Sequence, residues 1–231
     1  MERILTIALS ITATAALGFA QSTATQATLD SPLQQKYASQ LSASNDAEII
    51  VSNSGATGAG AALAAGSVGD DASVTGAICV NVYTLDPGEE LESCCSCPVT
   101  PDGLVSFFVY SNLLHNPLFP GAIPSSVTIK LYATVPPAGA TSCGKSASNT
   151  AAVAASGLVA WGTTTHVIPG NNPSLVATET AFTPVTPSAS EILKLQQTCE
   201  IAQNGASSGS GTCAGCPTLG NGAAGVSTST K

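Results

Sequence analysis

The chain has 231 residues, with 14 acidic and 6 basic side chains and a formal net charge of −8. Only 9% of the residues are charged and 44% are apolar, which excludes a disordered acidic tail because there is enough apolar material to bury a core. Lysine and arginine are too scarce for a nucleic-acid partner, since a phosphate lattice is bound through these side chains.

The first twenty residues are typical of a secretory signal peptide. Arg3 supplies a cation, residues 4–20 are apolar and uncharged, and Gly18 and Ala20 are the small residues of a cleavage site before Gln21. The apolar run is slightly short for a membrane anchor, which needs about 20 residues. We therefore expect a secreted mature chain, periplasmic or extracellular, with no membrane span.

All eight cysteines follow the expected cleavage point. An even number of cysteines behind an export signal predicts disulfides. They are Cys79, Cys94, Cys95, Cys97, Cys143, Cys199, Cys213 and Cys216. Cys94 and Cys95 are expected to bond to two different partners, because a bridge between neighbours is strained. One hypothesis pairs Cys199 with Cys213 and brings Cys216 to the cluster at 94–97.

A zinc site is the alternative interpretation of the same cysteines. Cys94, Cys95 and Cys97 could supply thiolates together with Cys213 and Cys216. The spacing is not that of paired C-x-x-C motifs, and exported thiols tend to oxidise, so disulfides are favoured and neither a metal nor a cofactor is expected.

The beginning of the mature chain is expected to be a polar lead-in over residues 21–47. Leu33, Tyr37 and Leu41 recur at four-residue spacing within it. This spacing places apolar side chains on one face of a helix and predicts a short helix over about 32–42.

Short segments rich in β-branched residues predict six strands. Residues 104–110 are apolar on both faces, which predicts a buried strand, whereas residues 127–135 alternate and predict a strand with one buried face. Residues 54–76 are rich in Gly, Ala and Ser and predict a long loop. The predicted strands are 48–53, 77–84, 104–110, 127–135, 157–168 and 175–182.

One helix is predicted near the C-terminus. Ser188 and Glu191 form a capping-box pattern at its start, and Asn204-Gly205 is a typical stop. Its apolar residues form a single stripe: Ile192, Leu195, Cys199 and Ala202.

Strands outnumber helices and do not alternate with them, which favours a mainly β fold. We expect an antiparallel β-sandwich, Ig-like or jelly-roll-like, with one C-terminal α-helix and stabilising disulfides. The expected organisation is a signal peptide at 1–20, the lead-in at 21–47, one disulfide-bridged domain at 48–216 and a flexible tail at 217–231.

Several segments together resemble a group of uncharacterised exported bacterial proteins. They include the motif CCSCPVTPDGL at residues 94–104 and the C-terminal helix with its cysteine, followed by a Gly/Ser run and a further cysteine. The resemblance covers most of the mature chain. It implies a shared disulfide-bearing domain and implies no activity.

The densest charge in the chain is an acidic run formed by Asp86, Glu89, Glu90 and Glu92. These carboxylates could bind calcium or another ligand, although they lack the order of an EF-hand loop. The alternative is that they are the solvated charges of a turn. Only ten aromatic residues occur in the chain, which argues against a cleft that stacks sugars.

Catalytic residue types are sparse. The two histidines, His115 and His166, could serve a hydrolase only beside a nucleophile and a carboxylate. Residues 205–209 match G-x-S-x-G, but a helix precedes the match where a nucleophile elbow requires a strand.

These patterns favour a secreted or cell-surface, non-enzymatic protein with a structural or adhesive role. Its partner would be an extracellular protein or a glycan. One alternative is an extracellular ligand-binding module for glycan or calcium, and a second is a secreted hydrolase.

Overall fold

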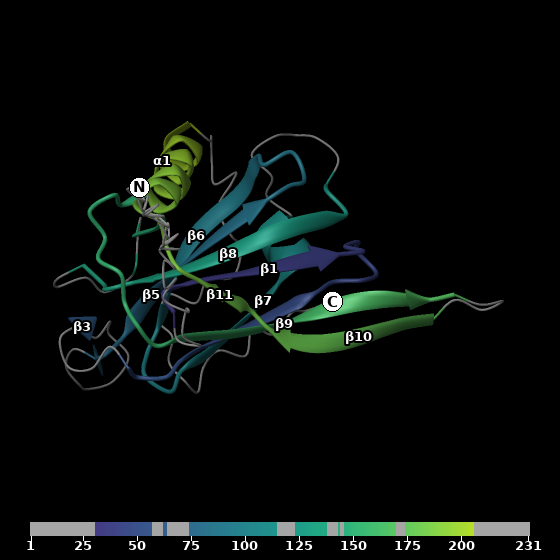
Figure 1. The fold of residues 1–231 in the computed structure, drawn as a ribbon, viewed down its shortest axis with the longest axis horizontal. Coiled ribbons are helices and arrows are strands. Elements are labelled where there is room, and N and C mark those ends of the chain that lie inside the picture. Colours follow the sequence, from purple (N-terminus) through teal and green to yellow (C-terminus); the bar gives the residue numbers. More distant parts are fainter. Residues whose placement is uncertain are drawn as a thin grey trace, which may run out of the picture.

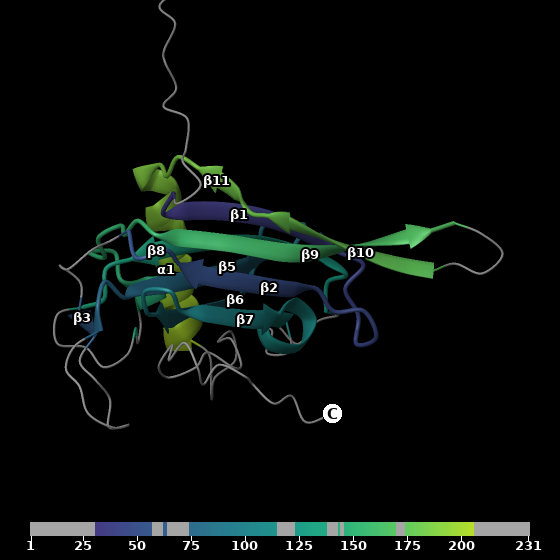
Figure 2. The ribbon, with the colours of Figure 1, turned by 90° about the horizontal axis from the view of Figure 1, so that it is seen from below.

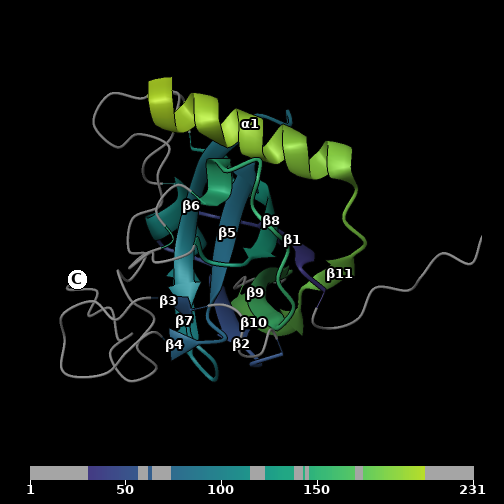
Figure 3. The same ribbon diagram turned by 90° about the vertical axis from the view of Figure 1, so that its left-hand side faces the viewer.

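Two antiparallel sheets packed face to face form a β-sandwich, and one helix crosses the outer face of one sheet (Figures 1 and 3). The computed structural model describes residues 31–56, 62–63, 74–114, 123–137, 143, 146–169 and 174–205. The fold class predicted from the sequence is confirmed: the chain is mainly β, with a C-terminal helix and disulfides. The expected signal peptide and the expected tail at 217–231 lie outside the described residues.

The larger sheet has the strand order β11-β1-β8-β5-β6, and the smaller sheet has the order β10-β9-β2-β7. A separate two-stranded pair, β3 and β4, falls inside the predicted loop at 54–76. The strands are β1 (Leu33–Ser39), β2 (Glu48–Asn53), β3 (Ala62–Leu63), β4 (Val74–Thr75), β5 (Ile78–Leu85), β6 (Leu91–Val99), β7 (Leu104–Phe108), β8 (Ser126–Thr134), β9 (Leu158–Ile168), β10 (Ser174–Ala181) and β11 (Thr183–Val185). The helices are α1 (Ala189–Gly205), a π-helix at Val109–Leu114 and a 3-10 helix at Ser146–Ser148.

The main core lies between the two sheets, whose layers Figure 3 shows from the side. Because side chains alternate along a strand, one face of β5 sends Ile78, Val80 and Val82 into this core. The opposite face of β5 contributes Tyr83 to a second core, which lies between the larger sheet and α1. The two cores make β5 buried on both faces along most of its length.

The predicted C-terminal helix is confirmed as α1. The Ser188 hydroxyl accepts a hydrogen bond from the backbone N–H of Glu191 at 3.2 Å, as a capping box requires. Leu195, Cys199 and Ala202 are buried in the second core, so the predicted apolar stripe faces the sheet.

All six cysteines that the structure describes are disulfide-bonded, which confirms the disulfide prediction for them. Cys79 bonds to Cys143, and Cys94 bonds to Cys199. The hypothesis that Cys199 pairs with Cys213 is therefore wrong, and so is the zinc interpretation of the 94–97 cluster. The physical reason is that α1 crosses the outer face of the sheet and its buried stripe places Cys199 over Cys94. Cys213 and Cys216 lie outside the described residues.

The predicted helix over 32–42 is wrong, because this segment forms β1 in the larger sheet. Residues 33–39 of the expected lead-in therefore belong to the larger sheet, whereas residues 21–30 lie outside the described residues. The four-residue spacing of Leu33 and Tyr37 is equally compatible with a strand, where both lie on one face. On the other face, Gln34 is buried and donates to the carbonyl of Leu158 at 2.6 Å.

Two further strand expectations need correction. The cysteine cluster lies within β6, which the sequence analysis did not predict as a strand. β6 ends its sheet, and an edge position tolerates Pro98. β7 was predicted to be buried on both faces, but only Val105 and Phe107 point into the core, and Leu104 and Phe108 on the opposite face are exposed.

Among the helices that the structure describes, none is both long enough and apolar enough to cross a membrane.

Candidate functional site

Helix α1 covers only part of the outer face of the larger sheet (Figure 3). The covered part is apolar and includes Leu33 of β1, Tyr132 of β8 and Tyr83 of β5. Farther along the same strands, the outward residues are Gln35 and Tyr37 on β1 and Thr128 and Lys130 on β8, which are in register with each other. The uncovered part of the face is therefore polar.

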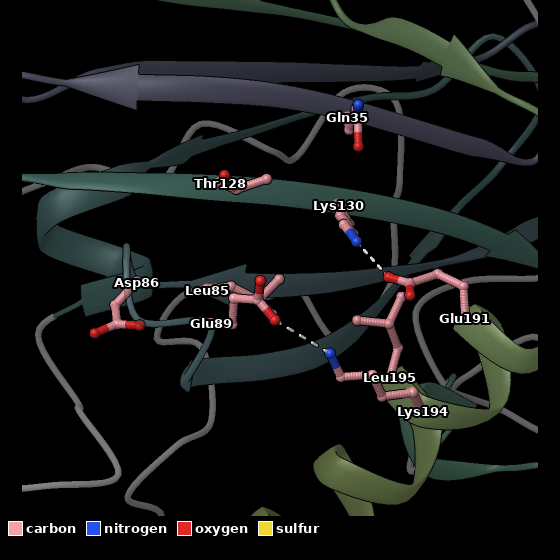
Figure 4. Close-up of a pocket in the computed structure, with 9 residues that line it drawn as sticks. All are labelled: Gln35, Leu85, Asp86, Glu89, Thr128, Lys130, Glu191, Lys194 and Leu195. Carbon is pink, nitrogen blue, oxygen red and sulfur yellow. Dashed lines mark hydrogen bonds and ion pairs between the residues drawn. The ribbon is translucent and has the colours of Figure 1, made fainter.

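A cavity of about 440 Å³ opens over this polar region (Figure 4). Its volume lies within the range of about 300–1,000 Å³ that is usual for small-molecule sites. The larger sheet forms the floor, the turn after β5 forms one wall, and α1 forms the other. The lining residues are Gln35, Leu85, Asp86, Glu89, Thr128, Lys130, Glu191, Lys194 and Leu195.

The first wall is a turn built around Asp86. The backbone carbonyl of Asp86 accepts a hydrogen bond from the N–H of Glu89 at 3.1 Å, and the Asp86 Oδ1 accepts one from the N–H of Glu90 at 2.8 Å. Glu89 has a φ of 66°, in the left-handed region, which the tight turn requires. This geometry fixes the backbone that carries the Glu89 side chain toward α1 (Figure 4).

Two ion pairs cross the pocket from the helix to the other side. Lys130 on the floor pairs with Glu191, and Lys194 on the helix pairs with Glu89 of the turn at 3.7 Å (Figure 4). The first pair is partly buried, whereas the second is largely exposed. The pocket thus contains three carboxylates and two ammonium groups, and both ammonium groups are already paired.

An exposed aromatic ring lies beside the pocket. Tyr37 is directly opposite Thr128 in the register of β1 and β8, so the two side chains share one face and are neighbours. Tyr37 is 58% exposed, an unusually large fraction for an aromatic residue on a sheet face that is partly covered. Tyr37 is not itself among the lining residues, but it is the cross-strand neighbour of Thr128, which is.

Only two of the four acidic residues that the sequence analysis singled out line the pocket. Asp86 and Glu89 line the pocket, but Glu90 and Glu92 are not among its lining residues. Burial raises the pKa of Glu92, and repulsion from Asp86 and Glu90 adds to the effect. Within the described residues, no three His, Cys, Asp or Glu side chains are grouped so that they could hold a metal ion.

Of the two candidate catalytic histidines, the structure describes only His166, which is not among the pocket's lining residues. His166 is exposed on β9, with its Nε2 3.1 Å from the Thr178 hydroxyl oxygen. His115 and the serines of the G-x-S-x-G match at 205–209 lie outside the described residues.

The sequence analysis missed most of the pocket. Thr128 and Lys130 occupy the polar face of a strand whose alternation it recognised, so a signal existed for the floor. No local pattern connects them with Glu191 or Lys194, because the helix reaches them only through the tertiary fold.

Comparison with known proteins adds no assignment: the chain matches no protein-family model, no curated protein and no solved structure significantly.

Proposed function

We propose that the chain is an exported, non-enzymatic adhesive protein that binds neutral saccharides in the pocket between α1 and the larger sheet. The observation that carries this proposal is the combination of internally paired charges with the exposed ring of Tyr37 at the border of the cavity. The disulfides agree with an oxidising environment such as the cell exterior.

The paired charges favour a neutral ligand over an anion. A phosphate or carboxylate would have to replace Glu191 at Lys130 or Glu89 at Lys194. A sugar hydroxyl both donates and accepts, so it can hydrogen-bond to a carboxylate and an ammonium group without separating them. The amide of Gln35 and the hydroxyl of Thr128 add further donors and acceptors on the floor.

Tyr37 supplies the apolar contact that such a ligand needs. One side of a pyranose ring presents C–H groups, and an exposed tyrosine ring offers a flat apolar face together with a polar tip. The low aromatic content of the chain is compatible with a single ring at the border of a small site. It limits the contact area, so we expect affinities for single sugars in the millimolar range, about 4 kcal/mol of binding free energy.

The pocket suits binding better than catalysis. Among the nine lining residues that the structure describes there is no histidine, serine or cysteine, and both glutamates are engaged by lysines. The Cys94–Cys199 disulfide anchors α1 and so holds one wall in place. A site that is already formed before binding loses less conformational entropy when the ligand arrives.

The proposal is tested by NMR titration of the oxidised, exported form with methyl glycosides of glucose, galactose, mannose and N-acetylglucosamine. At least one glycoside is expected to shift resonances of Gln35, Thr128 and Lys130. Tyr37→Ala should weaken that binding at least about tenfold, which corresponds to about 1.4 kcal/mol.

Leu104→Ala is the matched control, because Leu104 is 54% exposed and lies on the other sheet. It should leave the affinity unchanged. The proposal fails if none of the glycosides perturbs the pocket, if glucose 6-phosphate binds more tightly than glucose, or if Tyr37→Ala and Leu104→Ala behave alike.

A further inference from the structure

The β9–β10 hairpin extends beyond the body of the sandwich (Figures 1 and 2). All eight residues of β10 are exposed, so the strand is covered by no second layer. We call residues 163–168 of β9 and 174–181 of β10 the arm. Eight residues of strand span about 26 Å at the usual rise per residue.

The arm carries apolar side chains on both faces near its tip. Leu175 pairs with Val167 on one face, and the next positions place Val176 and Ile168 on the other. These four side chains are 41–54% exposed. A two-stranded ribbon is marginally stable in water, so covering these side chains would stabilise the arm.

Among the strands that the structure describes, β10 is the last of the smaller sheet, so no described strand pairs with its outer edge. Every second residue of such a strand presents an unpaired N–H and C=O to the outside. Proteins usually protect long edges with proline, lysine or a bulge. β10 contains no proline and no lysine, its pairing with β9 is regular, and its only charged residue is Glu179.

The charge distribution identifies the most suitable occupant of this edge. The chain has a net charge of −8, which opposes the approach of two copies over most of their surface. Within the arm, however, Glu179 and His166 are the only titratable side chains. A basic partner strand would be attracted to the acidic chain as a whole, but the arm itself carries only one acidic side chain to bind it. A second copy meets the least repulsion there.

We infer that the free edge of β10 pairs with β10 of a second copy of this chain, so that the two smaller sheets join into one continuous sheet. Antiparallel pairing of identical strands is two-fold symmetric, which gives a closed dimer. With the axis at Thr178, which then lies opposite its own copy, residues 175–181 overlap and opposite residues share one face of the joined sheet. Glu179 then lies opposite Ala177 of the second copy and not opposite another glutamate.

The test is sedimentation equilibrium of the oxidised, exported form over concentrations from micromolar to millimolar. The wild-type chain should show a reversible monomer–dimer equilibrium. The double variant Leu175→Lys/Val176→Lys should raise the dissociation constant at least about tenfold, because lysines on a strand edge oppose pairing.

Val153→Lys/Ile201→Lys is the control, since it replaces two exposed apolar residues outside the arm with the same added charge. It should dimerise as the wild-type chain does. A wild-type chain that remains monomeric throughout, an open-ended polymer without a dimer plateau, or equal weakening by both double variants would overturn the inference.

Hydrogen exchange provides a second readout that does not depend on any variant. Alternate backbone amides of β10 should exchange rapidly at low concentration and be protected at high concentration. Protection that appears on β7, the other edge of this sheet, without any on β10 would also overturn the inference.

Discussion

Cys94 and Cys199 are joined by a disulfide that fixes α1 to the edge strand β6 across 105 residues of sequence. Cys94 points to the outer face of the sheet, whereas its neighbour Cys95 belongs to the core between the sheets. The alternation of a single strand thus directs adjacent cysteines to two different layers. The outward one holds the helix that carries Glu191 and Lys194 to the pocket.

Removing this bridge by Cys94→Ala/Cys199→Ala should lower the free energy of unfolding by about 5 kcal/mol, the loss expected for a closed loop of about 100 residues. Because α1 loses its anchor, the pocket wall should also loosen and the affinity for a bound glycoside should fall. Guanidinium unfolding and NMR titration measure the two effects.

Cys79→Ala/Cys143→Ala is the control for the pocket effect. That bridge spans 64 residues and joins β5 to the segment just before the 3-10 helix at Ser146–Ser148, which contacts α1 at Gln203, several turns along the helix from Glu191 and Lys194. It should reduce stability by a similar amount and leave glycoside affinity unchanged in the folded protein. If both double variants reduce affinity equally, the Cys94–Cys199 bridge has no special role in positioning the helix.

Asn53 provides a second test, of the junction between the two sheets. Its fully buried Nδ2 donates to the carbonyls of Gly76 and Val99, both at 2.9 Å, and its Oδ1 accepts from the N–H of Gly55 at 2.8 Å. Asn53→Ala should cost about 3 kcal/mol, because it leaves buried groups without partners.

Asn53→Asp keeps the shape and the acceptor but removes both donors and introduces a buried charge. It should destabilise at least as strongly as alanine in urea unfolding at neutral pH. A cost below about 1 kcal/mol for both variants would mean that water replaces the lost side chain.

The fold class could be predicted from the sequence because alternation and capping are local signals. β8 and α1 illustrate this: β8 was found from its alternation, and α1 from its capping box together with its apolar stripe. β1 was missed because its sequence combines a helical spacing of apolar residues with a glutamine on the inner face. The burial of Gln34 depends on the carbonyl of Leu158, 124 residues away, which no local pattern reveals.

The residues of the pocket, too, could be predicted only where a local sequence pattern exists. Asp86 and Glu89 were found because they crowd a single turn. Lys130 and Glu191 meet only because α1 packs across β8, and the disulfide that holds the helix could not be chosen from the cysteine spacing. Tyr37 was placed on the apolar face of a helix, so its exposure beside the cavity could not be foreseen.

Glu92 gives the fold a defined pH dependence. Its pKa is raised above the ordinary value of 4.5, first by burial and then by the nearby carboxylates of Asp86 and Glu90. The folded state therefore holds this proton to a higher pH than the unfolded state does. The resulting destabilisation is absent well below pH 4.5 and grows as the pH rises through the folded-state pKa.

Glu92→Gln should accordingly stabilise the protein at neutral pH, and the difference from wild type should disappear at about pH 3. The gain is expected to stay below about 1 kcal/mol, because the side chain is partly exposed and solvent screens its interactions. Urea unfolding at both pH values measures it. Glu200→Gln, on the exposed face of α1, should have no effect at either pH. A gain that persists at low pH would point to a cause other than titration.

The last prediction joins the two proposals. If each copy has one saccharide site and copies pair through β10, a dimer presents two sites to a surface coated with sugars. Simultaneous engagement can raise the apparent affinity by about 10²–10⁴ without any new contact. Weak single-sugar binding is then sufficient for adhesion.

Leu175→Lys/Val176→Lys should therefore dissociate faster than wild type from a densely coated glycoside surface in plasmon resonance. Its affinity for the free methyl glycoside should stay the same, because the arm contributes no residue to the pocket. Tyr37→Ala should lose both kinds of binding. Equal retention of wild type and the arm variant, with dimerisation abolished in the latter, would show that adhesion depends on the pocket alone.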